Sequence, residues 1–184
     1  MHYNVELKPL DWILYPVNSF LGNPIRWFTG DKVHAAKFFT LGGRNLQFDA
    51  RWPYADVNPL SVELLKSKPG VAVRRFSAVD EMGGEQLAKL NDQLVDLIMI
   101  LWGQLAYDVG GLLAFPYRRL IKSRTGREAR SLPSDAFCSC LGAILDVKIL
   151  GLDPVPGLAD NVTSPWDVYE SAELKTITEN LKII

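Results

Sequence analysis

The sequence is poor in the residues that build metal sites and disulfide frameworks. It holds two cysteines, Cys138 and Cys140, and two histidines, His2 and His34, and none of their spacings matches a zinc finger. A closed zinc site needs four ligands, and a disulfide framework needs several well-separated cysteines. We therefore expect no metal site and no structural disulfide.

Charge of one sign and long apolar runs are also scarce. The formal net charge is -1, and the most apolar stretch, residues 94–115, is interrupted by Asp96, Gln104 and Asp108. Nucleic-acid binding needs a clustered basic excess, and a membrane span needs about 20 predominantly apolar residues. The first residues lack the basic and apolar regions of a secretory signal. We expect no nucleic-acid partner, no transmembrane segment and a cytoplasmic location as synthesised.

Basic residues do cluster in one place, residues 118–130, where they greatly outnumber acidic ones. The basic residues there are Arg118, Arg119, Lys122, Arg124, Arg127 and Arg130, with Glu128 as the acidic residue among them. This segment is either a solvated loop or a contact surface for an anionic lipid, polymer or partner.

Composition and pattern predict one α+β domain over residues 1–184. Hydrophobic residues make up 48% and charged residues 22% of the chain, which is an ordinary globular balance. Because strands and helices come in blocks rather than in strict alternation, the fold class is α+β. Ser77 or Asp80 would cap the first long helix. Apolar periodicity and turn residues predict strands over 11–17, 32–41, 46–52, 70–76 and 173–184, and helices over 86–105 and 136–151.

Both cysteines fall at the start of the second predicted helix, where they could be core residues or a reactive site. Free cysteines are often buried, but residues two apart on a helix point about 200° apart and cannot share one face. With Ser134 or Asp135 as the cap, Cys138 lies in the first turn, where the helix dipole and the unpaired N–H groups favour a thiolate. Cys138 is therefore the better nucleophile candidate, and Cys140 the better core residue.

A nucleophilic cysteine needs an imidazole, and His34 is the plausible one. It lies in an apolar strand, where a lone histidine is otherwise a core residue. Asp49 lies in the strand that would form a hairpin with it through residues 42–45, and could orient the ring across the strand pair. Two alternatives stay open: Asp49 on the solvated side of its strand, and Gln47 as the orienting residue.

The order of these pieces resembles the circularly permuted papain-like hydrolases, the NlpC-type branch in which the histidine precedes the cysteine. Leu10-Asp11 stands where the family has Gly-Asp, and Val33-His34-Ala35-Ala36 where it has Ser-His before small apolar residues. The resemblance covers about residues 10–172. Further matching segments follow in the family's order: "LQFDA" (46–50), "YADVNPL" (54–60), "GQLAYD" (103–108), "FCSCLGAIL" (137–145) and "TSPWDVYES" (163–171).

The resemblance implies a papain-like fold in permuted order, with an antiparallel sheet packed against helices. It implies Cys138 as nucleophile, His34 as base and Asp49 as the orienting residue, without a metal or organic cofactor. Tyr107 would line the site. The chain departs from the family pattern at three positions, with Val33 for Ser, Asp49 for Glu, and Cys140 for the Glu after Cys-Ser.

The function implied is that of a thiol hydrolase of amide bonds, acting on a peptide or on a peptidoglycan stem peptide in cell-wall degradation. A lipid ester or amide hydrolase, or an acyltransferase, would apply the same chemistry to a lipid acyl substrate. A third alternative is a non-catalytic structural or virion-assembly protein, part of a larger assembly, that keeps the fold. Trp52 and Trp166 would line an apolar substrate cleft or else belong to the core.

Overall fold

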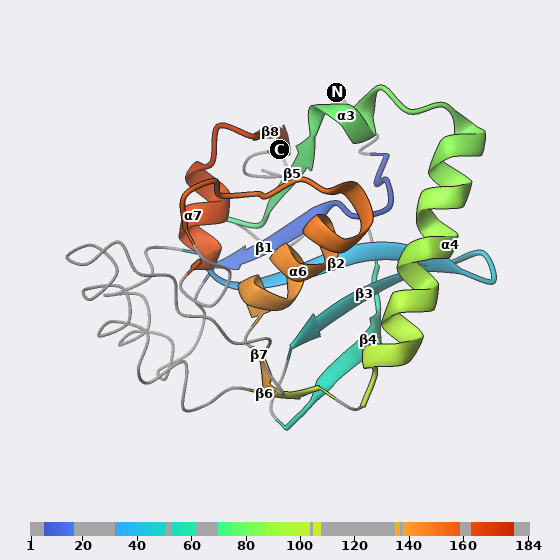
Figure 1. Cartoon of the computed structure of the whole chain (residues 1–184), viewed down its shortest axis with the longest axis horizontal. Helices are drawn as coiled ribbons and strands as arrows, with labels where there is room; N and C mark the ends of the chain where they lie inside the picture. The colour runs from blue at the N-terminus through green and yellow to red at the C-terminus, as the bar shows by residue number, and fades with distance from the viewer. Residues whose placement is uncertain are drawn as a thin grey trace.

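The structure is a computed structural model that describes residues 6–16, 32–50, 53–61, 70–103, 105–107, 135–136, 138–158 and 163–178. Six strands form one antiparallel sheet in the order β4-β3-β2-β1-β5-β8, and two more form a short parallel pair (Figure 1). The fold is α+β, with the sheet packed against helices. The strands are β1 (Trp12–Pro16), β2 (Lys32–Leu41), β3 (Arg44–Ala50), β4 (Ala55–Pro59), β5 (Ala72–Phe76), β6 (Ala106–Tyr107), β7 (Asp135–Ala136) and β8 (Leu174–Thr178). The helices are α3 (Ser77–Asp80), α4 (Gly84–Leu101), α6 (Cys138–Leu150) and α7 (Pro165–Glu170).

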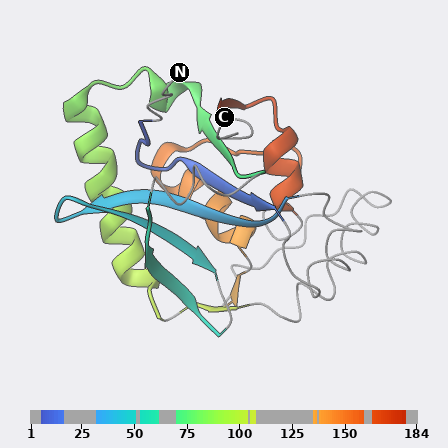
Figure 2. The same ribbon diagram turned by 180° about the vertical axis from the view of Figure 1, so that it is seen from behind.

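Helices α4 and α6 cover the same face of the sheet, which Figure 1 shows from the helix side and Figure 2 from the strand side. Side chains alternate between the two faces of a strand. Trp12 and Leu14 of β1 therefore join the main core under the helices, while Ile13 joins a second, smaller cluster on the opposite face. Among the described residues, no helix is long and apolar enough to cross a membrane.

The hairpin of β2 and β3 forms as the sequence predicts. Leu41 pairs with Arg44, and Gly42 and Gly43 make the turn with φ angles of 57° and 74°. A two-residue turn with positive φ at both positions matches the twist of the flanking strands, and glycine adopts it without steric cost. This turn sets the register that decides which residues of β2 and β3 meet.

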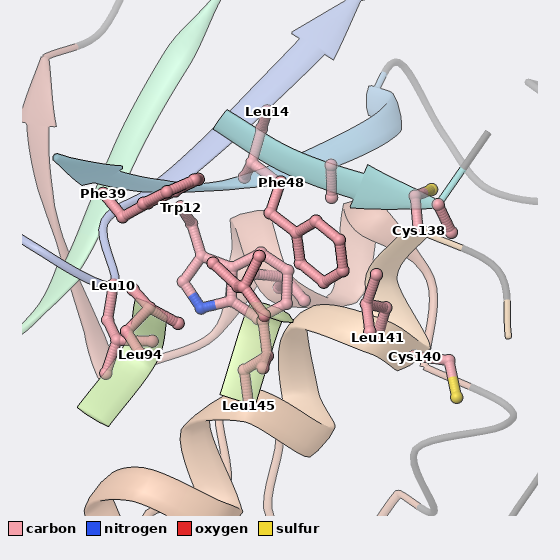
Figure 3. Packing of buried hydrophobic residues seen from close by; sticks show 14 of the residues in the cluster. Leu10, Trp12, Leu14, Phe39, Phe48, Leu94, Cys138, Cys140, Leu141 and Leu145 are labelled. Atoms are coloured by element: carbon pink, nitrogen blue, oxygen red, sulfur yellow. The ribbon is translucent and has the colours of Figure 1, made fainter. Parts of the chain in front are cut away.

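Helix α6 is buried all around in its first two turns. Every residue from Cys138 to Ala143 is buried, and Figure 3 shows the helix against Trp12 and Phe48 of the sheet. At Gly142 an added Cβ would lie 2.3 Å from Cη2 of Trp12, so only glycine allows this approach. Gly151, with φ of 69°, ends the helix as predicted, and its N–H donates to the carbonyl of Val147.

The predicted helix caps at Ser77, Asp80 and Asp135 are wrong. Helix α3 has Phe76 at its N-cap and α4 has Gly83, whose backbone N–H is bound by the side chain of Gln86. Asp80 instead binds Arg75 and Lys175, because a carboxylate between two cations is better satisfied there than at a helix end. Asp135 lies in β7 rather than at the start of α6, whose first residue is Cys138. Ser134 lies outside the described residues.

Strands β4 and β6 and helix α7 lie in segments for which the sequence predicted neither strand nor helix. Strand β4 forms an edge of the sheet next to β3. Helix α7 starts with a capping box, in which the Ser164 hydroxyl accepts from the Asp167 N–H and the Asp167 carboxylate accepts from the Ser164 N–H. Pro165 occupies the first helical position, where its missing N–H costs nothing.

Candidate active site

The β2–β3 hairpin brings His34 and Asp49 into contact. Lys37 pairs with Phe48 across the two strands, and continuing this register makes Asp49 the diagonal neighbour of His34 on the same face. Nε2 of His34 lies 2.5 Å from Oδ2 of Asp49. The Asp49 side chain is fully buried, so the alternative of a solvated Asp49 is wrong.

The other carboxylate oxygen of Asp49 has a partner on the edge strand. Nδ2 of Asn58 in β4 lies 3.4 Å from Oδ1 of Asp49. Asn58 and His34 thus approach the two oxygens of one carboxylate from either side of β3. The sequence reasoning did not single out Asn58, because its place beside Asp49 depends on the register of β3 and β4, Asp49 opposite Asp56.

Cys138, at the start of helix α6, contacts the same histidine. It is the first residue of α6, its exposed fraction is 5%, and its side chain hydrogen-bonds His34. Figure 3 shows Cys138 beside the end of β3, with Cys140 projecting from α6 in a different direction. Cys140 is buried, as expected of a core residue. The structure therefore brings together the three residues that the sequence analysis selected as nucleophile, base and orienting group.

The electrostatics of this cluster favour a charged imidazole. Burial by itself lowers the pKa of His34, but negative charge at Cys138 and the hydrogen bonds to Asp49 and Cys138 raise it, to about 10. The side chain of His34 is 27% exposed. His34 is thus held between two acidic groups while part of its surface stays open to solvent.

A tyrosine on the neighbouring strand completes the surroundings of His34. The ring centroid of Tyr15 lies 5.9 Å from that of His34, and Tyr15 Oη donates to Oε1 of Gln47 at 2.5 Å. The structure thus pairs Asp49 with His34 and Gln47 with Tyr15, which decides between the two orienting residues considered from the sequence. Tyr15 pairs directly with His34 in the β1–β2 register, a neighbour that the sequence alone did not identify.

Of the three residues predicted to line the substrate site, Trp166 is the one whose side chain the structure describes. Trp166 lies half-buried in α7 with its ring 5.1 Å from that of Tyr169. Tyr107 belongs to β6, and its side chain lies outside the described part of the structure. Trp52 and the basic segment 118–130 also lie outside the described residues.

Two buried charged residues that were not predicted from the sequence lie on the strand of His34 and on the helix of Cys138. Lys37 of β2 and Asp146 of α6 are buried, and Nζ lies 2.5 Å from Oδ1. Each is a single charge inside an apolar segment, "AAKFF" and "AILDV". A lone charge in such a pattern is the signal that could have identified them, because a buried charge requires a partner.

Within the described residues, no group of three or more His, Cys, Asp and Glu side chains could hold a metal ion.

Neither a protein-family model nor a curated protein sequence matches the chain. Among solved structures, the chain is similar to the crystal structure of metalloprotein yiiX from Escherichia coli O157:H7 (DUF1105), with a TM-score of 0.64 and 14% sequence identity. The match covers 94% of this chain and 97% of that chain. At this identity the similarity shows a shared fold.

Proposed function

We propose that the chain is a cysteine hydrolase of amide bonds with a circularly permuted papain-like fold. The observation that carries the proposal is that His34 contacts both Asp49 and Cys138. A nucleophile, a base within hydrogen-bond reach and a third group that orients the base form the arrangement of nucleophilic catalysis. The order of histidine before cysteine in the chain agrees with the permuted family that the sequence resembles.

In this mechanism Asp49 fixes the orientation of the imidazole. Because Nε2 of His34 is bound by Asp49, Nδ1 is the ring nitrogen left for Cys138. The raised pKa of His34 favours the imidazolium, which is the partner that keeps a thiolate ionised. The resting pair is then an imidazolium and a thiolate.

The first turn of α6 supplies the rest of the chemistry. The thiolate of Cys138 attacks the amide carbonyl carbon, and the carbonyl oxygen takes up the negative charge. N–H groups of a helix's first turn have no carbonyl partner within the helix, so those at the start of α6 could stabilise this oxyanion. His34 gives its proton to the leaving amine, and the acyl group stays on Cys138. His34 then takes a proton from water, and the resulting hydroxide attacks the thioester carbonyl. The acyl group leaves as the carboxylic acid, the sulfur of Cys138 leaves as the thiolate, and the imidazolium–thiolate pair is restored.

We expect the substrate to be a peptide or a peptidoglycan stem peptide. The experiment that tests the proposal is alkylation of Cys138 by iodoacetamide as a function of pH, in wild type and His34→Ala, with each modified cysteine assigned by mass spectrometry. We expect fast labelling of Cys138 that has reached its plateau well below the ordinary cysteine pKa of about 8.5, and loss of this plateau in His34→Ala.

Cys140 serves as the internal control, because it is buried in the same helix and its side chain projects in a different direction from that of Cys138 (Figure 3). Labelling of Cys138 that rises only near pH 8.5 and does not change in His34→Ala would refute the thiolate–imidazolium pair. A positive result leads to a panel of peptide, stem-peptide and lipid-ester substrates, with Cys138→Ser as the inactive control.

A further inference from the structure

A buried ion pair joins the strand that carries His34 to the helix that carries Cys138. Nζ of Lys37 lies 2.5 Å from Oδ1 of Asp146. The side chains of both residues are almost completely buried, at 1% and 0% exposed. Lys37 lies three positions after His34 on β2, and Asp146 lies eight positions, about two turns, after Cys138 on α6.

Further contacts hold both ends of this pair in place. Nζ of Lys37 also donates to the carbonyl of Leu10 at 3.0 Å and lies 3.8 Å from the ring centroid of Trp12. Nε1 of Trp12 donates to Oδ2 of Asp146 at 2.8 Å. The same Trp12 ring packs against Gly142, where no Cβ fits. Rotation or sliding of α6 along the sheet would therefore break directional bonds as well as apolar contacts.

We propose that Lys37 and Asp146 are positioning residues that fix the start of α6, and so Cys138, relative to His34. This inference rests on the proposed function. A helix that packs on a sheet through apolar contacts alone can shift slightly along it. A buried ion pair with additional hydrogen bonds holds the helix in one position, because these bonds depend on direction. The acyl-transfer geometry needs such precision, since a displacement of about 1 Å can reduce rate about 100-fold.

The energetics agree with a positional role for the pair. Burial lowers the pKa of Lys37 to about 8 and raises the pKa of Asp146 to about 6, although the attraction between the two opposes both shifts. The negative charge of Asp11 also raises the pKa of Lys37, and the negative charge of Asp153 raises the pKa of Asp146. A buried pair whose charges are both penalised by burial contributes little to stability over an apolar pair of the same size.

The test compares three variants with wild type: Asp146→Asn, the double variant Lys37→Met/Asp146→Leu, and the control variant Asp80→Asn. Asp80 accepts hydrogen bonds from Arg75 of β5 and Lys175 of β8, so its replacement removes charged contacts that involve neither β2 nor α6. The readouts are the pH dependence of Cys138 alkylation, the NMR titration of His34 and the midpoint of denaturant unfolding.

We expect Lys37→Met/Asp146→Leu to unfold at a moderately lower midpoint than wild type. Both charges are removed together, but the indole N–H of Trp12 and the carbonyl of Leu10 lose their bonds to this pair.

At pH 6 Cys138 of this double variant should react about 10- to 100-fold more slowly than in wild type, and His34 should titrate closer to the ordinary histidine range. The control variant should keep the wild-type labelling profile. Asp146→Asn, which preserves volume, should show the same slow labelling and provides the test if the double variant does not fold.

Wild-type labelling in both Asp146→Asn and Lys37→Met/Asp146→Leu would overturn the positional role and leave the proposed function intact. Equal slowing in the control variant would also overturn it, because the effect would then follow general stability. If wild type itself lacks the low-pH plateau, the proposed function fails, and the positional role fails with it.

Discussion

Replacement of Gly142 by alanine places a methyl group where the ring of Trp12 already lies. The new Cβ would be 2.3 Å from Cη2 and 2.4 Å from Cζ3 of Trp12, whereas ordinary contact starts near 3.4 Å. The ring or the helix must therefore move by about 1 Å. Neither moves easily, because Trp12 is fully buried and its Nε1 donates to Asp146 on the same helix.

The energy can be estimated from two opposing effects. Overpacking of a tight core costs about 1–3 kcal/mol, here toward the upper end because a rigid ring fills the space. Alanine is better than glycine inside a helix by about 1 kcal/mol. We expect Gly142→Ala to lower the free energy of unfolding by about 1–2 kcal/mol, and the melting temperature by roughly 2–8 °C. Displacement of α6 should also slow alkylation of Cys138, one turn earlier.

Denaturant unfolding of wild type, Gly142→Ala and Gly84→Ala measures this effect. Gly84 is the first residue of α4, and an added Cβ there meets no atom within 4 Å. The control should therefore be as stable as wild type or slightly more stable. Unfolding of Gly142→Ala at the wild-type midpoint with an unchanged slope would refute the argument that the Trp12 ring fills this site.

Two further predictions concern carboxylates. Asp49→Asn should keep the fold but lower the pKa of His34 and reduce low-pH alkylation of Cys138, because the charge that stabilises the imidazolium is lost; an unchanged NMR titration of His34 would contradict this. Hydrogen bonds from Lys175 and Arg75 lower the pKa of Asp80 to about 2. Asp80→Asn should therefore be less stable than wild type above about pH 4, with a difference that disappears as pH falls toward 2. A difference in unfolding free energy that is independent of pH would count against the Asp80 contacts.

Several parts of the site were predictable from local patterns. The Gly42-Gly43 turn between two apolar strands predicts the hairpin, and the hairpin makes a contact between His34 and Asp49 plausible before the structure is known. Gly151 predicts the end of α6 correctly. The predicted caps at Ser77 and Asp135 failed because cap residues have alternatives: Gly83 caps α4 with the help of Gln86, and Asp135 lies in a strand.

Residue types and spacings along the chain were sufficient to select the candidate triad and the fold class, because strand alternation, turn chemistry and helix starts act over a few neighbouring residues. Only the tertiary structure decided that Cys138 meets His34 and that Lys37 meets Asp146, residues 109 positions apart. Whether a charge such as Lys37 is buried or solvated depends on what a distant helix places over it. That arrangement follows from the packing of α6 on the sheet, with Gly142 against Trp12, and from the free energy of the whole core.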